Sequence, residues 1–345
     1  MQFIRPDINI DFIGKRRLAY VFSALLLLAT VVTLVWHQGP RYGVDFAGGT
    51  VIQLKFDRPV SLDAIRAGLS EIGLGQGTVQ RFGEHEDNEY LVRSDLAESR
   101  DGLAQELART LDGRTGAVTD VQRIEMVGPQ VGKDLQNKAL FAIFFSMLFI
   151  AIYISGRFEQ RWTVAALIAA ALIGAVYGLS LFKVGIAWLI LAGLIVTLIL
   201  FWFLELRYAM GAIVALIHDV GITIGVFSLL DKEFTLPIIA ALLTIIGYSL
   251  NDTIIIFDRI RENLRKNPRN PLETTVNRSV NETLSRTILT SGTTLVVVLA
   301  LFTLGGGIIH DFAFALLIGI LVGTYSSIYV ASPILLLWQK RARRT

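Results

Sequence analysis

The chain has 345 residues, of which 53% are hydrophobic and 18% are charged, and its formal net charge is +3. Soluble domains carry roughly a quarter of charged residues, so this composition indicates a membrane protein. Because the sequence contains no cysteine, a disulfide scaffold, a cysteine-ligated metal centre and a cysteine nucleophile are all excluded.

Eight stretches of the sequence are long and apolar enough to cross a bilayer, which takes about 20 consecutive residues. We predict spans at residues 18–36, 139–155, 162–182, 185–204, 209–230, 235–257, 287–304 and 312–338. The first span follows a basic N-terminal segment, residues 1–17, and has no small-residue cleavage site after it. It is therefore predicted to be an uncleaved anchor rather than a signal peptide.

Basic residues gather on one side of these spans. The short segments on that side hold Arg157, Arg161, Arg207, seven basic residues within 258–286 and a basic tail at 339–345, whereas the opposite short loops hold Lys183 and Lys232. The positive-inside rule then places both termini in the cytoplasm and the long segment 37–138 outside. That segment carries 12 basic and 16 acidic residues. The surplus of positive charge therefore belongs to the cytoplasmic rim, where it favours anionic membrane lipid over nucleic acid.

The segment 37–138 alternates short strand and helix patterns. We expect strands at 42–56, 78–82, 89–93 and 117–127, and helices at 61–74 and 98–111. The order βαββαβ is typical of a ferredoxin-like α+β domain. The predicted fold class is thus a polytopic α-helical membrane protein, with about eight spans (18–36 and a bundle at 139–338) and one ferredoxin-like extramembrane domain at 37–138.

Nothing in this domain suggests catalysis, and we interpret it as a binding module. Its histidine, His85, lies in an acidic turn, and the glycine run at 73–77 lacks the spacing of a nucleotide-binding loop. No phosphate-binding motif G-x-x-x-x-G-K-[ST] occurs in the sequence, so ATP hydrolysis by the chain is not expected. No cofactor is expected, and the chain is not expected to be an enzyme.

Two acids fall within predicted spans, where an ionised side chain costs about 2.5–3.5 kcal/mol. Asp219 follows His218 in the fifth span, and Asp252 follows Asn251 in the sixth. Such acids are typical of proton relays and ion sites, although Asp252 could instead reach the membrane surface and Asp219 could make a structural hydrogen bond. For His218 we favour an interhelical hydrogen bond over metal binding, and we expect no metal site.

Helical spacing extends each acid into a polar stripe. Thr244, Tyr248 and Asp252 share one face, as do Asp219 and Thr223. The seventh predicted span supplies a third stripe of Arg286, Thr290 and Thr293. Turned inward, the three stripes are expected to form a buried cluster of aspartate, arginine and hydroxyl groups. In the last span Gly319 and Gly323 form a small-residue face suited to close helix packing.

These residues lie in segments that resemble the SecF family of protein translocase subunits. The resemblance runs along the whole chain, in the expected order. It is carried by residues 42–50 (YGVDFAGGT), 127–134 (VGPQVGKD), 215–220 (ALIHDV), 247–253 (GYSLNDT), 257–263 (FDRIREN), 283–287 (TLSRT) and 325–333 (YSSIYVASP). The first of these segments contains Asp45, Gly48 and Gly49 as the outer-domain motif.

The resemblance implies a function that the residues alone do not. Members of the family act with SecD in the bacterial inner membrane, where they use the proton-motive force to assist preprotein translocation at the SecYEG channel, with YajC as a further associate. A membrane aspartate and an arginine of neighbouring helices take part in proton conduction, and they correspond here to Asp252 and Arg286. The outer domain is implied to move as protons pass.

One feature departs from the family, whose members normally have six spans. The surplus pair falls at 162–204, between two similar junctions, FEQRW at 158–162 and LELRY at 204–208. We predict a two-helix insertion, which leaves every later orientation unchanged.

Two other functions remain open. A non-conducting scaffold of the translocase would need no membrane acids. A small-molecule proton-antiport pump of the related resistance–nodulation–division type would need a much larger outer domain.

Overall fold

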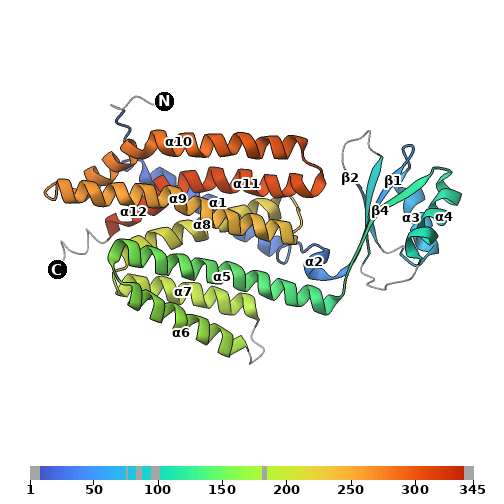
Figure 1. Cartoon of the computed structure of the whole chain (residues 1–345), viewed down its shortest axis with the longest axis horizontal. Coiled ribbons are helices and arrows are strands. Elements are labelled where there is room, and N and C mark those ends of the chain that lie inside the picture. Colours follow the sequence, from blue (N-terminus) through green and yellow to red (C-terminus); the bar gives the residue numbers. More distant parts are fainter. Residues whose placement is uncertain (1–7, 75–76, 83–87, 95–101, 181–184, 338–345) are drawn as a thin grey trace.

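A bundle of long helices and a small α+β domain lie at opposite ends of an elongated molecule (Figure 1). The structure is a computed structural model, and it describes residues 8–74, 77–82, 88–94, 102–180 and 185–337. Eight described helices are long and apolar enough to cross a membrane, which confirms the predicted number of spans. They are α1 (Arg16–Trp36), α5 (Pro129–Glu159), α6 (Trp162–Ser180), α7 (Ile186–Phe203), α8 (Arg207–Leu229), α9 (Leu236–Lys266), α10 (Leu272–Leu304) and the helix that begins as α11 (Gly307–Ser326).

Helices α9 and α10 are longer than the apolar stretches predicted for them. They continue past the bundle as a helical hairpin at the end remote from the α+β domain, which we call the distal end (Figure 1). Ion pairs one helical turn apart, such as Lys266 with Glu262 at 2.7 Å and Arg278 with Glu282 at 2.8 Å, support these polar extensions. The prediction ended both spans where their apolar pattern stops.

The last span is not one regular helix. After α11 the backbone forms a π-helical turn at Ser327–Ala331, followed by α12 (Ser332–Ile334). A π-turn inserts one extra residue into the helical repeat and therefore changes which side chains face a neighbour. The predicted span at 312–338 is present as a single span, Ile309–Ile334, that contains this turn. Residues 338–345, with the basic tail, lie outside the described part of the chain.

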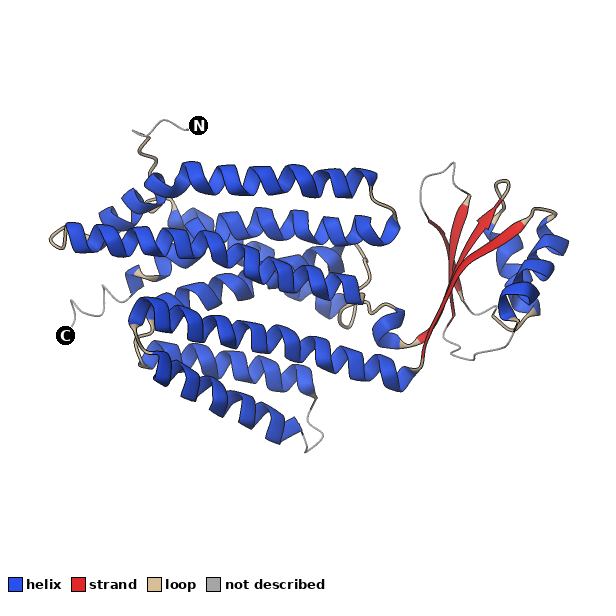
Figure 2. Ribbon diagram, in the orientation of Figure 1, coloured by secondary structure: helices blue, strands red, loops and turns tan. Residues whose placement is uncertain are grey.

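The α+β domain has the ferredoxin-like fold that the sequence predicts. Strands β1 (Gly49–Phe56), β2 (Thr78–Phe82), β3 (Glu89–Ser94) and β4 (Thr119–Val127) form an antiparallel sheet in the order β2-β3-β1-β4. Helices α3 (Leu62–Glu71) and α4 (Leu103–Thr115) cover the face of the sheet that is turned away from the bundle (Figure 2). Alternate residues of β1 are buried beneath them, as a half-covered sheet requires. Residues 98–101, the predicted start of the second helix, lie outside the described residues.

The strand predicted at 42–56 is wrong in its first half. Val44–Ala47 form a short helix, α2, and β1 begins only at Gly49. The carboxylate of Asp45 accepts a hydrogen bond from the amide of Leu236, at 2.8 Å, and so caps the start of α9. Gly48 has a φ of +80°, and a Cβ there would lie 2.8 Å from Pro129, the first residue of α5. This motif therefore attaches the domain to the bundle instead of extending the sheet.

A second attachment is ionic. Arg93 of β3 forms an ion pair with Glu233 in the loop between α8 and α9, and Arg41 contacts the same carboxylate at 3.5 Å. Burial and the positive charge of Arg41 lower the pKa of Arg93 to about 10, although Asp311 acts in the opposite direction. Because this pKa is still well above neutral pH, Arg93 stays charged and the ion pair persists.

Candidate functional site

Two carboxylates lie inside the helical bundle. Asp219 of α8 is 0% exposed and Asp252 of α9 is 2% exposed. The segment of α11 that leads into the π-turn is linked to both: Ser326 donates to Asp219, and Thr324 contacts Ser291, a neighbour of Asp252. A charged group at this depth is costly unless it is paired or can take up a proton, so the surroundings of each acid decide its role.

Asp252 sits at the start of a short chain of hydroxyl groups. Ser291 of α10 lies 3.3 Å from Asp252 Oδ2 and 2.7 Å from Thr324 Oγ1, and Thr324 donates its own proton to the carbonyl of Ile320. Ser291 has one proton, which it can donate either to an ionised Asp252 or to Thr324. In the second case Ser291 can accept a proton from a protonated Asp252. The site therefore satisfies both protonation states of Asp252 by rotating one hydroxyl.

Only part of the expected inward cluster of the three stripes forms. Thr290 and Arg286 of α10 lie near enough to Asp252 to interact with it. Arg286, Thr244 and Thr293 are exposed, and no ion pair joins Arg286 to Asp252 among the described residues. Thr244 and Thr293 donate instead to carbonyls of their own helices, at 2.8 and 2.9 Å. A threonine can satisfy its hydroxyl in this way without any neighbouring helix, so helical spacing alone does not establish a contact.

A second polar stripe of α10 is more deeply buried, and its last member, Ser291, contacts Asp252. Thr283, Thr287 and Ser291 recur every fourth residue and are all buried. The four-residue spacing of these hydroxyl residues is visible in the sequence, whereas the predicted stripe used the neighbouring face that contains Arg286. Thr290, which was predicted to lie beside Asp252, does so. It is half-buried, and its hydroxyl donates to the Arg286 carbonyl at 3.0 Å.

An exposed polar surface adjoins Asp252. It comprises Thr244 and Asn251 of α9 with Thr293 of α10, all within the apolar spans, and Arg286 at the start of the apolar part of α10. Beside it the hydroxyl of Tyr248 is buried and has no hydrogen-bond partner within the described chain. Polar groups at membrane depth are unfavourable against lipid. We call this surface the polar face of α9 and α10.

Asp219 has more partners than Asp252. Its Oδ2 accepts hydrogen bonds from Ser249 of α9 and from Ser326 of α11, the latter at 2.8 Å, and its Oδ1 lies 2.9 Å from His218 Nδ1. His218 Nε2 lies 3.0 Å from the hydroxyl of Ser23 in α1, which is the interhelical hydrogen bond expected for this histidine. Thr223, predicted on the face of Asp219, bonds only the backbone carbonyl of that residue.

Close contact between α9 and α11 brings these groups together. A Cβ on Gly319 would lie 2.3 Å from the side chain of Ile245, and a Cβ on Gly323 would lie 2.9 Å from Ser249 Cβ. Larger residues would separate the helices. Gly323 in particular keeps Ser249 within reach of Asp219.

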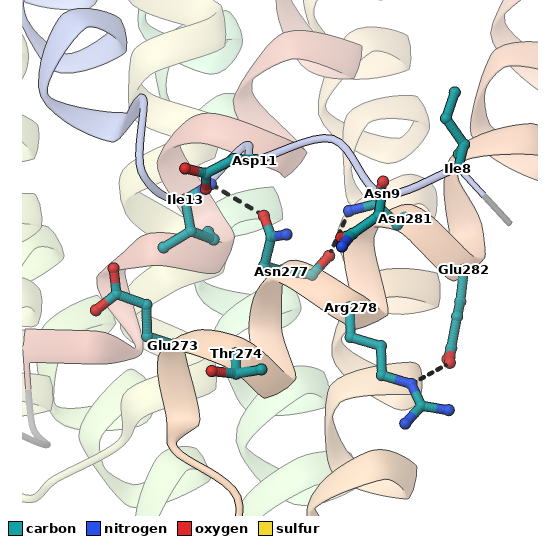
Figure 3. A pocket seen from close by; sticks show the side chains of 10 residues that line it. All are labelled: Ile8, Asn9, Asp11, Ile13, Glu273, Thr274, Asn277, Arg278, Asn281 and Glu282. Atoms are coloured by element: carbon teal, nitrogen blue, oxygen red, sulfur yellow. Dashed lines mark hydrogen bonds and ion pairs between the residues drawn. The ribbon is translucent and has the colours of Figure 1, made fainter.

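A cavity of about 540 Å³ lies away from both acids at the distal end, between residues 8–13 and α10 (Figure 3). The side chains of Asn277 and Asn281 protrude into it but are already bonded to the backbone of Ile10, Phe12 and Ile13. These bonds tie the N-terminal segment to α10. Within the described residues, no three histidine or acidic side chains are grouped as a metal site would require.

Comparisons with known proteins identify the family. A sequence profile described as "Protein export membrane protein SecD/SecF, C-terminal" matches residues 110–173 and 168–341, and one described as "SecD/SecF GG Motif" matches 33–60. The chain is 39% identical to the protein translocase subunit SecF of Calditerrivibrio nitroreducens, over 100% of this chain and 99% of that protein. The chain belongs to the SecF family. The resemblance stated from its sequence is thereby confirmed, and its relatives are named as components of protein transport.

One more SecF relative and a solved structure support the same family assignment. SecF of Desulfurispirillum indicum is 41% identical over 96% of this chain and 92% of its own length. The crystal structure of SecDF from Thermus thermophilus, described as a translocon-associated membrane protein, matches 98% of this chain with a TM-score of 0.71 and 33% identity. The chain spans 40% of that longer SecDF chain.

Proposed function

We propose that this SecF family member acts with SecD to convert the proton-motive force into late movement of preproteins through SecYEG, and that Asp252 binds the transported proton. One observation carries the proposal: rotation of the Ser291 hydroxyl satisfies Asp252 in both of its protonation states. A carboxylate that binds and releases a proton in every cycle works best when few hydrogen bonds must rearrange as its charge changes. Arg286, on the same two-helix hairpin, supplies a positive charge that favours release.

The polar face of α9 and α10 supports a membrane partner at this site. Asn251 is exposed within the apolar part of α9, and Arg286 is exposed where the apolar part of α10 begins, both next to a buried carboxylate. Lipid alone would make this arrangement costly. A second membrane subunit with polar groups of its own would cover them. The homologous SecDF chain, in which this chain matches 40% of the length, makes SecD the natural candidate.

The available energy is sufficient for a mechanical role. One proton that crosses 100 mV releases about 2.3 kcal/mol. An equilibrium between two orientations of a domain shifts by nearly two powers of ten with that energy. We place the α+β domain in the periplasm and both termini in the cytoplasm, so the domain would meet the preprotein as it leaves SecYEG. Motif residues 42–50 would transmit the movement, because Asp45 caps α9, the helix of Asp252.

The decisive test is preprotein translocation into inverted inner-membrane vesicles that contain this chain and its SecD partner, with and without a proton-motive force. Asp252→Asn should abolish the force-dependent part and leave ATP-driven transport by the remaining machinery intact. Arg286→Gln should reduce the same part about tenfold or more, whereas Arg286→Lys should retain some of it.

A matched control lies on the same helix. Asp258 is also an aspartate of α9, but it is partly exposed and pairs with Arg157 at 2.5 Å near the distal end. Asp258→Asn should leave force-dependent translocation unchanged. If Asp252→Asn behaves like Asp258→Asn in an assembled complex, Asp252 is not the proton site and the scaffold function is favoured.

A further inference from the structure

The hydrogen bonds around His218 continue beyond Asp219 to helix α1. His218 Nε2 contacts Ser23 Oγ at 3.0 Å, Ser23 Oγ contacts the Tyr325 hydroxyl at 3.0 Å, and Tyr325 donates to the carbonyl of Ala19 at 2.7 Å. The chain of contacts therefore runs from α8 through α1 to α11 and back to the backbone of α1. Each hydroxyl in it has a single proton, so the direction of every hydrogen bond can be worked out.

The positions of these protons determine the protonation state of His218. A carbonyl oxygen cannot donate, so Tyr325 must use its proton on Ala19. Ser23 must then donate to Tyr325, and His218 Nε2 must carry a proton to donate to Ser23. With Nε2 protonated, the 2.9 Å contact between His218 Nδ1 and Asp219 Oδ1 needs a further proton, held either by the carboxyl or by the ring.

We propose that His218 and Asp219 form a second proton-binding site, and that a bound proton holds α11 against α1 through Tyr325. In the loaded state described above the pair has no net charge. Release sends the Nε2 proton to water, and the proton between the two side chains settles on Nδ1, opposite an ionised Asp219. The proton count balances: one leaves, and the hydroxyl protons of Ser23 and Tyr325 rotate but are not lost.

Release has a defined structural consequence. Once Nε2 is bare, Ser23 turns its proton to the ring and Tyr325 turns its proton to Ser23. Tyr325 then no longer bonds the Ala19 carbonyl, which removes a direct hydrogen bond between α11 and α1. The released pair also carries an unpaired negative charge in a position that is 0% exposed, so release requires the bundle to open or rearrange.

The surroundings of the pair fit this role. A cavity of about 310 Å³ is lined by His218, Ser23 and Tyr20 and otherwise by apolar side chains. Its polar part lies at His218, where the proton can leave the pair. Titratable groups on the adjoining elements are Tyr20 of α1, Asp252 of α9, Tyr325 of α11 and Tyr329 of the π-turn. In the described part of the chain, no lysine or arginine forms an ion pair with either member of the pair.

This inference rests on the proposed function in one respect: protons must enter the helical bundle while the protein functions. It is tested without translocation, by solid-state NMR of the full chain in lipid vesicles with labelled histidine and tyrosine. Between about pH 4 and 10, His218 should change from the Nε2-protonated to the Nδ1-protonated form, and the ring carbon next to the Tyr325 hydroxyl should shift at the same pH. His218→Gln and Tyr325→Phe assign the two signals.

Three variants separate the possible results. Ser23→Ala should let His218 titrate while Tyr325 stops responding, because the link between them is removed. Asp219→Asn should abolish the shared transition, and Asp252→Asn should preserve it. A His218 form that is constant over the whole range, or a transition that Tyr325 does not share in the parent chain, would overturn the proposal. Neither result depends on whether Asp252→Asn impairs translocation, so the two proposals can fail separately.

Discussion

Asp219 and Asp252 lie on neighbouring helices and are both buried, yet they are held in different ways. Asp219 receives two hydroxyl protons and contacts a histidine, with partners on α9, α11 and its own helix. Asp252 has Ser291 at 3.3 Å and Thr290 beside it, and it borders a polar surface that the chain leaves exposed. The first acid is part of the packing of four helices, and the second lies at the edge of the bundle.

This difference separates two tasks that one membrane carboxylate cannot perform equally well. A site that exchanges protons quickly should lose few contacts when its charge changes, as Asp252 does. A site whose charge alters the packing must be connected to several helices, as Asp219 is through Ser249, Ser326 and the chain that leads to Tyr325. The polar face beside Asp252 implies that its environment is completed by a partner, whereas that of Asp219 is complete within the chain.

The largest expected effect is on the free energy of unfolding, which should fall much more for Asp219→Ala than for Asp252→Ala. Asp219→Ala leaves two serine hydroxyls and a histidine nitrogen without their partner in a fully buried position, and each such group costs about 1–3 kcal/mol. We expect a loss of about 3–5 kcal/mol in the free energy of unfolding. Asp252→Ala affects one long hydrogen bond, and we expect about 1 kcal/mol. The measurement is the unfolding midpoint of each variant in mixed micelles.

The corresponding asparagine variants are the controls, because they keep an acceptor oxygen in place. Asp219→Asn should recover a large part of the loss, and Asp252→Asn should be close to the parent. Equal losses for the two alanine variants would contradict the distinction between the sites.

The sequence predicted the architecture well, because apolar length and alternation are local properties. Eight spans and the order of elements in the α+β domain were both correct. Both membrane acids were also identified, since an acid within an apolar run stands out without any knowledge of its neighbours. The segment 42–48 was misassigned because its conformation depends on Asp45 reaching α9, almost 200 residues further along the chain.

The partners of the acids were harder to predict. Arg286 and Ser291 lie on different faces of α10, and the choice between them depends on the rotation of the helix, which packing against α9 and α11 determines. The π-turn at Ser327 is likewise invisible in a hydropathy pattern, and it follows directly after the residues that serve both acids. Long-range ion pairs such as Arg93 with Glu233 have no local signature either.

A smaller effect can show which of two glycines supports the Asp219 site. Gly319→Ala and Gly323→Ala should each lower the free energy of unfolding by about 1–3 kcal/mol, because both press α11 away from α9. Gly323 lies against Ser249, a donor to Asp219, whereas Gly319 lies against Ile245. Only Gly323→Ala should therefore change the pH at which His218 titrates, which the histidine NMR signal measures. If both variants shift it equally, the packing and the proton site are coupled through the whole helix and not through Ser249.

The smallest expected effect concerns the polar face beside Asp252. Tyr248 has a buried hydroxyl with no partner in the described chain, so Tyr248→Phe should change the free energy of unfolding of the isolated chain by less than about 0.5 kcal/mol. Tyr90→Phe is the matched control, because the Tyr90 hydroxyl bonds the backbone of Val60 at 2.6 and 3.1 Å and its loss should cost about 1–3 kcal/mol. If SecD covers the polar face, Tyr248→Phe should instead weaken the complex, measured as faster dissociation of SecD in detergent. A large loss in the isolated chain with no effect on the complex would mean that Tyr248 serves the internal packing, and that the partner binds elsewhere.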